Sequence, residues 1–172
     1  WSNGYQVGRK AAAANLADIA AMGATPTALL VGLGAPGTLP VDWALALADG
    51  LRDECAPLGA SVVGGDVIRA EAITVAVTAL GDLAGRAPVT RAGALPGDLV
   101  ALVGRVGWST AGLALLTVAP DEPEVAGSPL VRAHRQPEPP YRAGVVAAEH
   151  GATAMIDVSD GLLQDLGHVA RG

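Results

Sequence analysis

The sequence predicts an α+β fold in two domains, and three observations predict it. Hydrophobic residues make up 51% of the chain and charged residues only 16%, which is typical of a protein with a packed core. Residues 7–80 read in order as helix, strand, helix, strand and strand, as in a two-layer α+β domain. Residues 91–100 are rich in turn formers and predict a hinge. We therefore expect an N-terminal α+β domain over residues 1–91 and the start of a second α+β domain over residues 92–172.

The predicted elements of the first domain follow from the spacing of its apolar residues. Two segments have apolar residues at helical spacing, and each ends at proline or glycine. Three short runs are apolar or rich in β-branched residues, as strands are. The predicted helices are residues 7–22 and the segment from Pro40 to Pro57, and the predicted strands are residues 27–34, 61–66 and 72–80.

The second domain has weaker signals. Residues 99–104 and 152–158 are short apolar runs that predict strands. Helices are predicted at residues 108–118, with Ser109 as a candidate N-cap, at residues 141–151, and from Ser159 onward. Between them we expect an exposed acidic loop at residues 119–129 and an extended, proline-rich segment at residues 134–140.

Charge and composition exclude several classes of protein. The net charge of −6 leaves no basic stripe that could neutralise a nucleic acid backbone. No run of eighteen apolar residues is free of charge, glycine and proline, so we expect no membrane span. The single cysteine, Cys55, allows no internal disulfide and favours a reducing, cytoplasmic location; we interpret it as a small residue on a helix. Because the chain starts without methionine and ends in what reads as a helix, we expect it to be part of a longer protein.

Asp18 is the only charged residue in the alanine-rich segment from Ala11 to Ala24. A carboxylate in an apolar helix is costly unless it is paired with a cation or bound to a metal. One interpretation is that Asp18 reaches solvent past small alanines, or pairs with Arg9 or Lys10. The other is a metal or phosphate site, with Asn15 one turn earlier on the same side.

Two further segments place acidic residues after a predicted strand. In VVGGD (62–66), the glycine pair allows a close approach of the backbone to phosphate, and Asp66 could hold a hard cation; a tight turn is the alternative. In AMIDVSDGL (154–162), Asp157, Ser159 and Asp160 stand near a helix start. A helix cap explains one of them, but two acids so close repel each other unless a cation such as Mg²⁺ lies between them.

Basic and histidine residues give weaker signals. Arg86 and Arg91 flank a turn, and arginine suits phosphate recognition, although most loop arginines are solvated. His134, His150 and His168 lack metal-ligand spacing, and we interpret them as surface or helix-end residues.

Taken together, these segments resemble the family of thiamine-monophosphate kinases, which is related to aminoimidazole ribonucleotide synthetase and selenophosphate synthetase. The resemblance runs in order through GRKAAAANLADIAAMGA, VVGGDVIR, VTALGDLAGRAPVTRAGALPGD, WSTAGLALL, AHRQPEPPY and AMIDVSDGLLQDLGH, and so covers nearly the whole chain. It implies an N-terminal domain that dimerises through its sheet, followed by a second α+β domain.

The resemblance also implies an activity and roles for residues. The implied reaction is the Mg²⁺-dependent phosphorylation of thiamine monophosphate by ATP, with in-line transfer between substrates in a cytoplasmic homodimer. By motif, the implied metal ligands are Asp18, Asp66, Asp157 and Asp160, and the implied contacts to ATP are Gly65, Asp66, Arg91 and Ser159. No residue acts as a covalent catalyst in this scheme.

The sequence departs from the family pattern at several points. Ala17 stands where relatives have serine, and Trp108 stands where they have aspartate. The sequence has no counterpart of the upstream Gly-Asp-Asp and Asp-Thr metal motifs or of the downstream Gly-Glu-Asp substrate region. We therefore expect these 172 residues alone to be catalytically inactive. Two alternatives stay open: a related ATP-dependent synthetase, and an inactive dimerisation or ligand-binding fragment.

Overall fold

The computed structural model describes all 172 residues and begins with the long helix α1 (Gly4–Ala21). This helix starts before residue 7 because Asn3 and Gln6 form a capping box, in which each side chain accepts the other residue's backbone N–H. The helix ends as predicted, because Gly23 adopts a φ of 80° just beyond its C-cap.

A three-stranded sheet follows, and its order is β2-β1-β3. The central strand pairs parallel with β2, through a helical crossover, and antiparallel with β3. The elements are β1 (Thr25–Ala35), α2 (Val41–Cys55), a 3-10 turn (Ala56–Leu58), β2 (Ser61–Arg69) and β3 (Thr74–Asp82). All three predicted strands and both predicted helices of this half are therefore confirmed.

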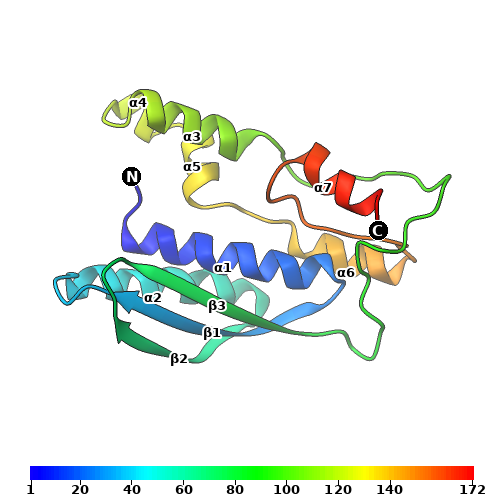
Figure 1. Ribbon diagram of the computed structural model, residues 1–172, viewed down its shortest axis with the longest axis horizontal. Helices are drawn as coiled ribbons and strands as arrows, with labels where there is room; N and C mark the ends of the chain where they lie inside the picture. Colours follow the sequence, from blue (N-terminus) through cyan, green and yellow to red (C-terminus); the bar gives the residue numbers. More distant parts are fainter.

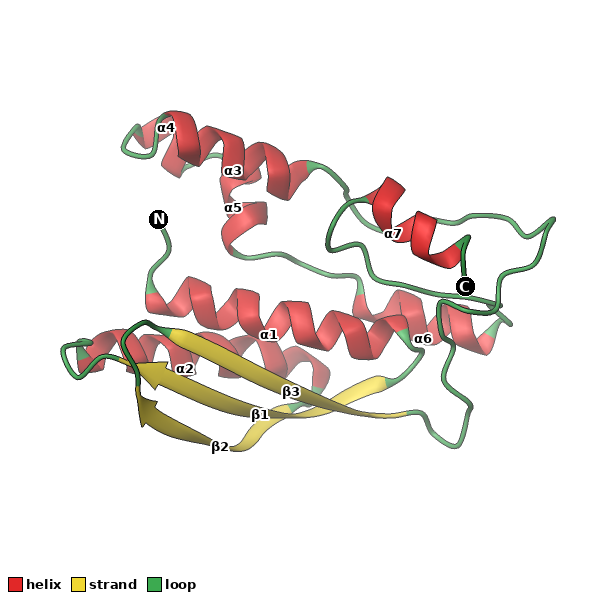
Figure 2. Ribbon diagram, viewed as in Figure 1, coloured by secondary structure: helices red, strands yellow, loops and turns green.

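The core lies between the sheet and the two long helices. Leu16 of α1 and Leu29 of β1 are fully buried, and Leu47 and Leu51 of α2 pack with them. Figures 1 and 2 show α1 and α2 running along the sheet. The burial of β1 indicates that residues at alternate positions of this strand point toward the two helices. The other positions, such as Leu30, form an outer face that no helix covers.

The second half of the chain is helical. Its elements are α3 (Trp108–Val118), α4 (Pro123–Ala126), α5 (Pro129–Arg135), α6 (Tyr141–Glu149) and α7 (Leu162–Val169). Leu116 of α3 packs with Val131 of α5, and both are fully buried, while α6 packs along the end of α1 (Figure 1). None of the helices is both long and apolar enough to cross a membrane.

Several expectations for this half are wrong. Residues 99–104 and 152–158 form no strand, because neither finds a partner strand to hydrogen-bond; Leu99 is 96% exposed. Gly107, not Ser109, is the N-cap of α3, and the expected acidic loop at residues 119–129 contains the short helix α4. The two-domain division at residue 92 stays a prediction, although no helix or strand lies between β3 and α3.

Candidate functional site

Five of the seven predicted site residues line one pocket of about 460 Å³. They come from three distant parts of the chain: α1, the loop after β3, and the segment between α6 and α7. These five are Asp18, Arg91, Asp157, Ser159 and Asp160. The fold therefore assembles most of the predicted site from residues that are far apart in sequence.

Asp18 and Asp157 line the same pocket, and each carboxyl group affects the pKa of the other. Partial burial raises the pKa of both carboxyl groups, and the charge of Asp18 raises the pKa of Asp157 further. Asp165 and Asp160 add to the effect on Asp157. Asp18 forms no ion pair with Arg9, since Arg9 is bonded to Glu54. Burial is therefore the main reason why both carboxyl groups hold their protons more tightly than usual, and for Asp157 the neighbouring carboxylates add to it.

The loop after β3 joins the two sides of the pocket. Val89 donates its N–H to the Met22 carbonyl at the end of α1, and Met155 donates its N–H to the Thr90 carbonyl, each at 3.1 Å. The next residue, Arg91, is exposed at the pocket and forms no ion pair. These two backbone bonds therefore hold the segment that carries Arg91 at the pocket of the acidic pair.

Arg86 has a different role from Arg91. Its guanidinium donates to the Gly23 carbonyl at 3.0 Å and pairs with Glu149 at 3.2 Å. It thus ties the loop after β3 to the end of α1 and to the end of α6. We interpret Arg86 as a structural contact and not as a phosphate ligand.

Asp165 is a site residue that the sequence reasoning missed. It is 3% exposed, and its Oδ2 accepts the backbone N–H groups of Asp160 and Gly161, each at 3.1 Å. The carboxylate therefore holds the turn that carries Ser159 and Asp160, just before α7 begins at Leu162. The signal was present in SDGLLQDLGH, where an acid follows the first by five residues and can reach back over the start of the helix.

The donors of the pocket are suited to a hard cation. Its polar lining has four carboxyl groups and the hydroxyls of Ser159 and Thr90 beside Arg91 and His168, and Mg²⁺ prefers such oxygen ligands. No group of three or more acidic, histidine or cysteine side chains is placed to hold a metal by itself. The Asp18–Asp157 pair could therefore supply some of the ligands of an ion. Mg²⁺ sites commonly take their other ligands from substrate phosphates and waters.

Gly65 and Asp66 do not line this pocket, because they lie on strand β2. Gly65 has a φ of 153°, and a Cβ there would lie 1.9 Å from the Val31 carbonyl oxygen. Its close approach is therefore to the neighbouring strand. The Asp66 side chain is exposed and accepts the N–H of Val67 at 2.8 Å. Nothing in the structure brings these two residues to the acidic pair.

The remaining candidates lie on helices or at helix ends. Asn15 donates its side-chain amide to the Ala11 carbonyl and stays outside the pocket. The three histidines are at the ends of helices, and Cys55 is buried at the end of α2. Of the histidines, only His168 also lines the pocket.

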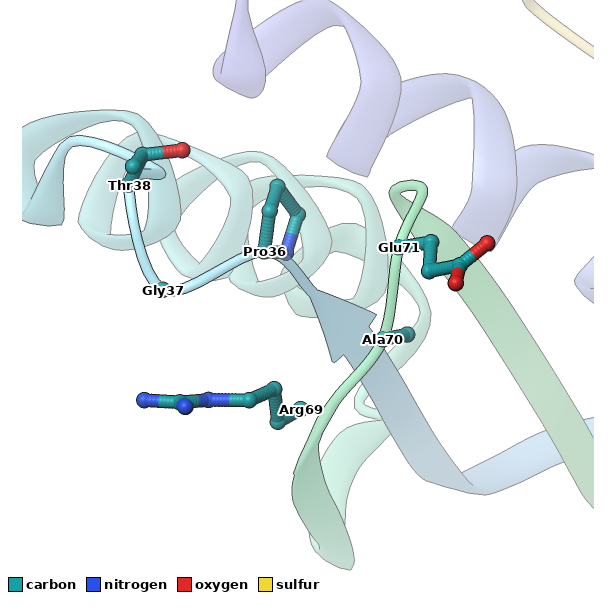
Figure 3. Close-up of a pocket in the computed structure, with 6 residues that line it drawn as sticks. All are labelled: Pro36, Gly37, Thr38, Arg69, Ala70 and Glu71. Carbon is teal, nitrogen blue, oxygen red and sulfur yellow. The ribbon is translucent and has the colours of Figure 1, made fainter.

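A second hollow of about 550 Å³ lies between the loop after β1 and the turn after β2. Figure 3 shows that Arg69 extends beneath Gly37 while Glu71 points the opposite way. Although this hollow is larger, its two charged groups do not converge on one point. We therefore assign the candidate site to the pocket at Asp18.

Comparison with known proteins first defines a class. Residues 2–83 match the family model for AIR synthase related protein, N-terminal domain. This range contains α1, the whole sheet and α2, so the first half of the chain is similar to this domain family.

The particular proteins that the chain resembles are thiamine-monophosphate kinases, which confirms the resemblance seen in the sequence. The relative from Mycobacterium tuberculosis is 51% identical over 99% of this chain, and the one from Corynebacterium glutamicum is 43% identical over 99%. The structure of the Aquifex aeolicus enzyme matches with a TM-score of 0.90 at 32% identity, over 98% of this chain and 56% of that one. AaThiL complexed with AMPPCP and TMP matches with a TM-score of 0.89, over 98% and 53%. The chain spans about half the length of the curated relatives it matches.

Proposed function

We propose that this chain is part of a thiamine-monophosphate kinase that transfers a phosphoryl group from ATP to thiamine monophosphate. The observation that carries the proposal is the acidic pair of Asp18 and Asp157, which lines one pocket together with Arg91. Its support from relatives is the 51% identity to a thiamine-monophosphate kinase and the similarity to a structure that holds AMPPCP and TMP.

The residues of the pocket have distinct roles in this proposal. Asp18 and Asp157, with Asp160 beside them, would hold Mg²⁺, which supplies charge neutralisation for the phosphates of both substrates. Arg91 would form paired hydrogen bonds with phosphate oxygens, and Ser159 would donate its hydroxyl to another. Alignment and charge stabilisation account for most of the catalysis of phosphoryl transfer, so no nucleophilic side chain is required.

Gly65 and Asp66 keep their proposed contacts with ATP, and Asp66 its proposed metal contact. Their support is the VVGGD motif and the exposed position of Asp66 on β2. Since they are separate from the pocket, we propose that they reach the nucleotide from a different side. The proposed homodimer and the cytoplasmic location rest on the family resemblance, and the dimer is also supported by the uncovered face of the sheet.

The test is an assay of the full-length gene product with ATP, Mg²⁺ and thiamine monophosphate. We expect thiamine diphosphate to form, and Asp18→Asn to lower kcat by at least about 100-fold, since the loss of a metal ligand costs more than the loss of its supporting groups. Asp121→Asn is the matched control, because Asp121 is exposed in the loop before α4. A parallel assay with the precursor of aminoimidazole ribonucleotide tests the alternative that the protein is a related ATP-dependent synthetase.

Two outcomes would contradict the proposal. Near-normal turnover by the Asp18→Asn variant would exclude the role of Asp18 as a ligand. ADP release with the synthetase substrate, and none with thiamine monophosphate, would assign the site to the other reaction.

A further inference from the structure

Glu54 is a buried carboxylate that joins three helices and lies outside the candidate site. It is on α2, is 5% exposed, and uses both of its oxygens. Oε2 accepts from Arg9 Nε of α1 at 2.5 Å, and Oε1 accepts from the hydroxyl of Tyr141 of α6 at 2.6 Å. A buried carboxylate is costly unless its oxygens are paired, and here each oxygen has a partner from a different helix.

Tyr141 is suited to act as a permanent donor in this cluster. Burial raises its pKa above the ordinary 10.0, and the hydrogen bond to Glu54 raises it further, so the hydroxyl keeps its proton. Its ring packs against the hydrophobic core between α1, α2 and the sheet. Tyr141 is also the first residue of α6, so the bond fixes the end at which this helix begins.

Small residues make close contacts between α6 and the end of α1. A Cβ on Gly144 would lie 1.9 Å from the Ala20 carbonyl oxygen, and one on Gly23 would lie 2.6 Å from the Cβ of Ala148. Small residues let two helices approach closely, but they offer few protrusions that would stop one helix from sliding along the other. The bond at Tyr141 fixes the start of α6, while Arg86 ties its other end to Gly23 through Glu149.

The position of α6 along α1 matters because it determines where Asp157 lies. Ala20, which α6 touches, is two residues beyond Asp18 on α1, and the chain leaves α6 directly for the segment that carries Asp157. Figure 1 shows α6 beside the end of α1, with the following segment running back toward α7. A shift of α6 along α1 would therefore change the separation of the acidic pair.

We propose that Tyr141, bonded to Glu54, is a positioning residue that fixes α6 on α1 and thereby sets the separation of Asp18 and Asp157. This inference rests on the proposed function only in that the acidic pair is taken as the active site. Tyr141 touches neither carboxylate of the pair and acts through the helix it begins.

The test compares two tyrosine-to-phenylalanine variants of the full chain. Tyr141→Phe removes the bond that includes α6. Tyr5→Phe removes a hydroxyl that donates to Asp53 at 3.1 Å and accepts from Arg9 at 3.5 Å, and these contacts involve only α1 and α2. Each is made in a background with Asp18→Cys and Asp157→Cys, and the two thiols are bridged with dibromobimane, which becomes fluorescent only when it links both. Cys55 stays in place because it is buried.

We expect Tyr141→Phe to slow the bridging by about tenfold, the factor that one hydrogen bond to a charged group contributes, and Tyr5→Phe to leave the rate within about twofold. If the double-cysteine background does not fold, exchange of the Met155 amide is measured in the single variants instead. That amide is bonded to Thr90 across the pocket, and its exchange should be faster only in Tyr141→Phe.

Equal rates in the two variants, by either readout, would overturn the inference, because a general loss of stability would then explain both. Neither readout requires Mg²⁺, ATP or turnover. A protein that proved not to be a kinase would therefore contradict the proposed function and still leave the effect of Tyr141 on the acidic pair to be decided.

Discussion

At the scale of single residues, the site depends on two carboxylates that repel each other unless something lies between them. Asp18 is exposed and Asp157 is half-buried, so neither is held in place by burial alone. Burial is the main cause of both raised pKa values, and acidic neighbours add to the cost of charging Asp157; such shifts are more frequent at functional sites than elsewhere. This cost should be visible in the stability of the protein.

We predict that Asp157→Asn stabilises the metal-free protein at neutral pH. The pKa of Asp157 is raised above 3.8, so the folded state binds the proton more tightly than the unfolded chain does. The favourable contribution of the protonated Asp157 carboxyl to the free energy of unfolding is therefore complete below the unfolded pKa of about 3.8. It is lost as the pH rises through the folded pKa. Asparagine does not titrate, and the melting temperature of the variant relative to wild type should rise by about 2 °C between pH 3.5 and pH 7.

The measurement is thermal unfolding of both proteins across this pH range with a chelator present. Saturating Mg²⁺ serves as the control, because a cation that binds the pair should remove the advantage of the variant. A difference in melting temperature that does not change with pH would show that Asp157 is not strained by its neighbours.

The sequence identifies the site residues themselves better than it identifies the residues that hold them in place. Asp18 stood out because it is the one charge in an alanine-rich segment, and Asp157 and Asp160 because they are two acids near one helix start. Asp165 did not stand out, since an acid in the first turn of a helix is common and only the folded turn shows that its side chain reaches back. The distance between Asp18 and Asp157 depends on how α6 docks, which no local pattern describes.

At the scale of elements, the first half of the chain was predictable because each element there has its partners within the chain. The alternation of β3 and the apolar run of β1 both describe strands that pair with each other. Residues 99–104 and 152–158 have the same kind of pattern but remain irregular, because strand formation requires a neighbour to accept the backbone hydrogen bonds. A local pattern indicates the capacity to form a strand and not the presence of its partner.

The glycine pair of β2 gives a prediction at this scale. A Cβ at Gly65 would lie 1.9 Å from the Val31 carbonyl oxygen, in a backbone conformation that favours glycine, whereas a Cβ at Gly64 would meet only the end of the Leu30 side chain at 3.2 Å. We expect Gly65→Ala to lower the free energy of unfolding by about 3 kcal/mol and Gly64→Ala by less than about 1 kcal/mol.

Urea unfolding of the two variants measures this difference directly. The adjacent position is a close control, since both substitutions add one methyl group to the same strand. Similar losses at both positions would show that β2 tolerates the added atom and that Gly65 is not required for pairing with β1.

At the scale of the whole molecule, the uncovered face of the sheet is the feature that still needs a partner. The register places Leu30, Ile68 and Leu80 on this face, where they are 40%, 60% and 48% exposed. Of the outward positions on the three strands, only Asp66 and, at the end of β3, Asp82 are charged. A charge-poor sheet face of this kind is an unfavourable surface in water and is typical of an interface.

We predict that the proposed homodimer forms through this face and that Leu30→Arg disrupts it. Leu30 is on the central strand, so an arginine there would be buried without a partner at the middle of the interface. The dimer dissociation constant should rise by at least about 100-fold, as expected when an uncompensated charge is placed in an interface core. Val118→Arg is the control, because Val118 is 84% exposed at the end of α3, away from the sheet.

Sedimentation velocity of the full-length protein over a range of concentrations separates the outcomes. A wild-type dimer, a monomeric Leu30→Arg variant and a dimeric Val118→Arg variant would support the sheet as the interface. If both variants remain dimeric, the interface lies elsewhere, and the apolar face must be covered by another part of the same protein. If wild type is monomeric throughout, the homodimer proposal fails, and Asp66 on this face must reach the nucleotide within a single chain or have no part in binding it.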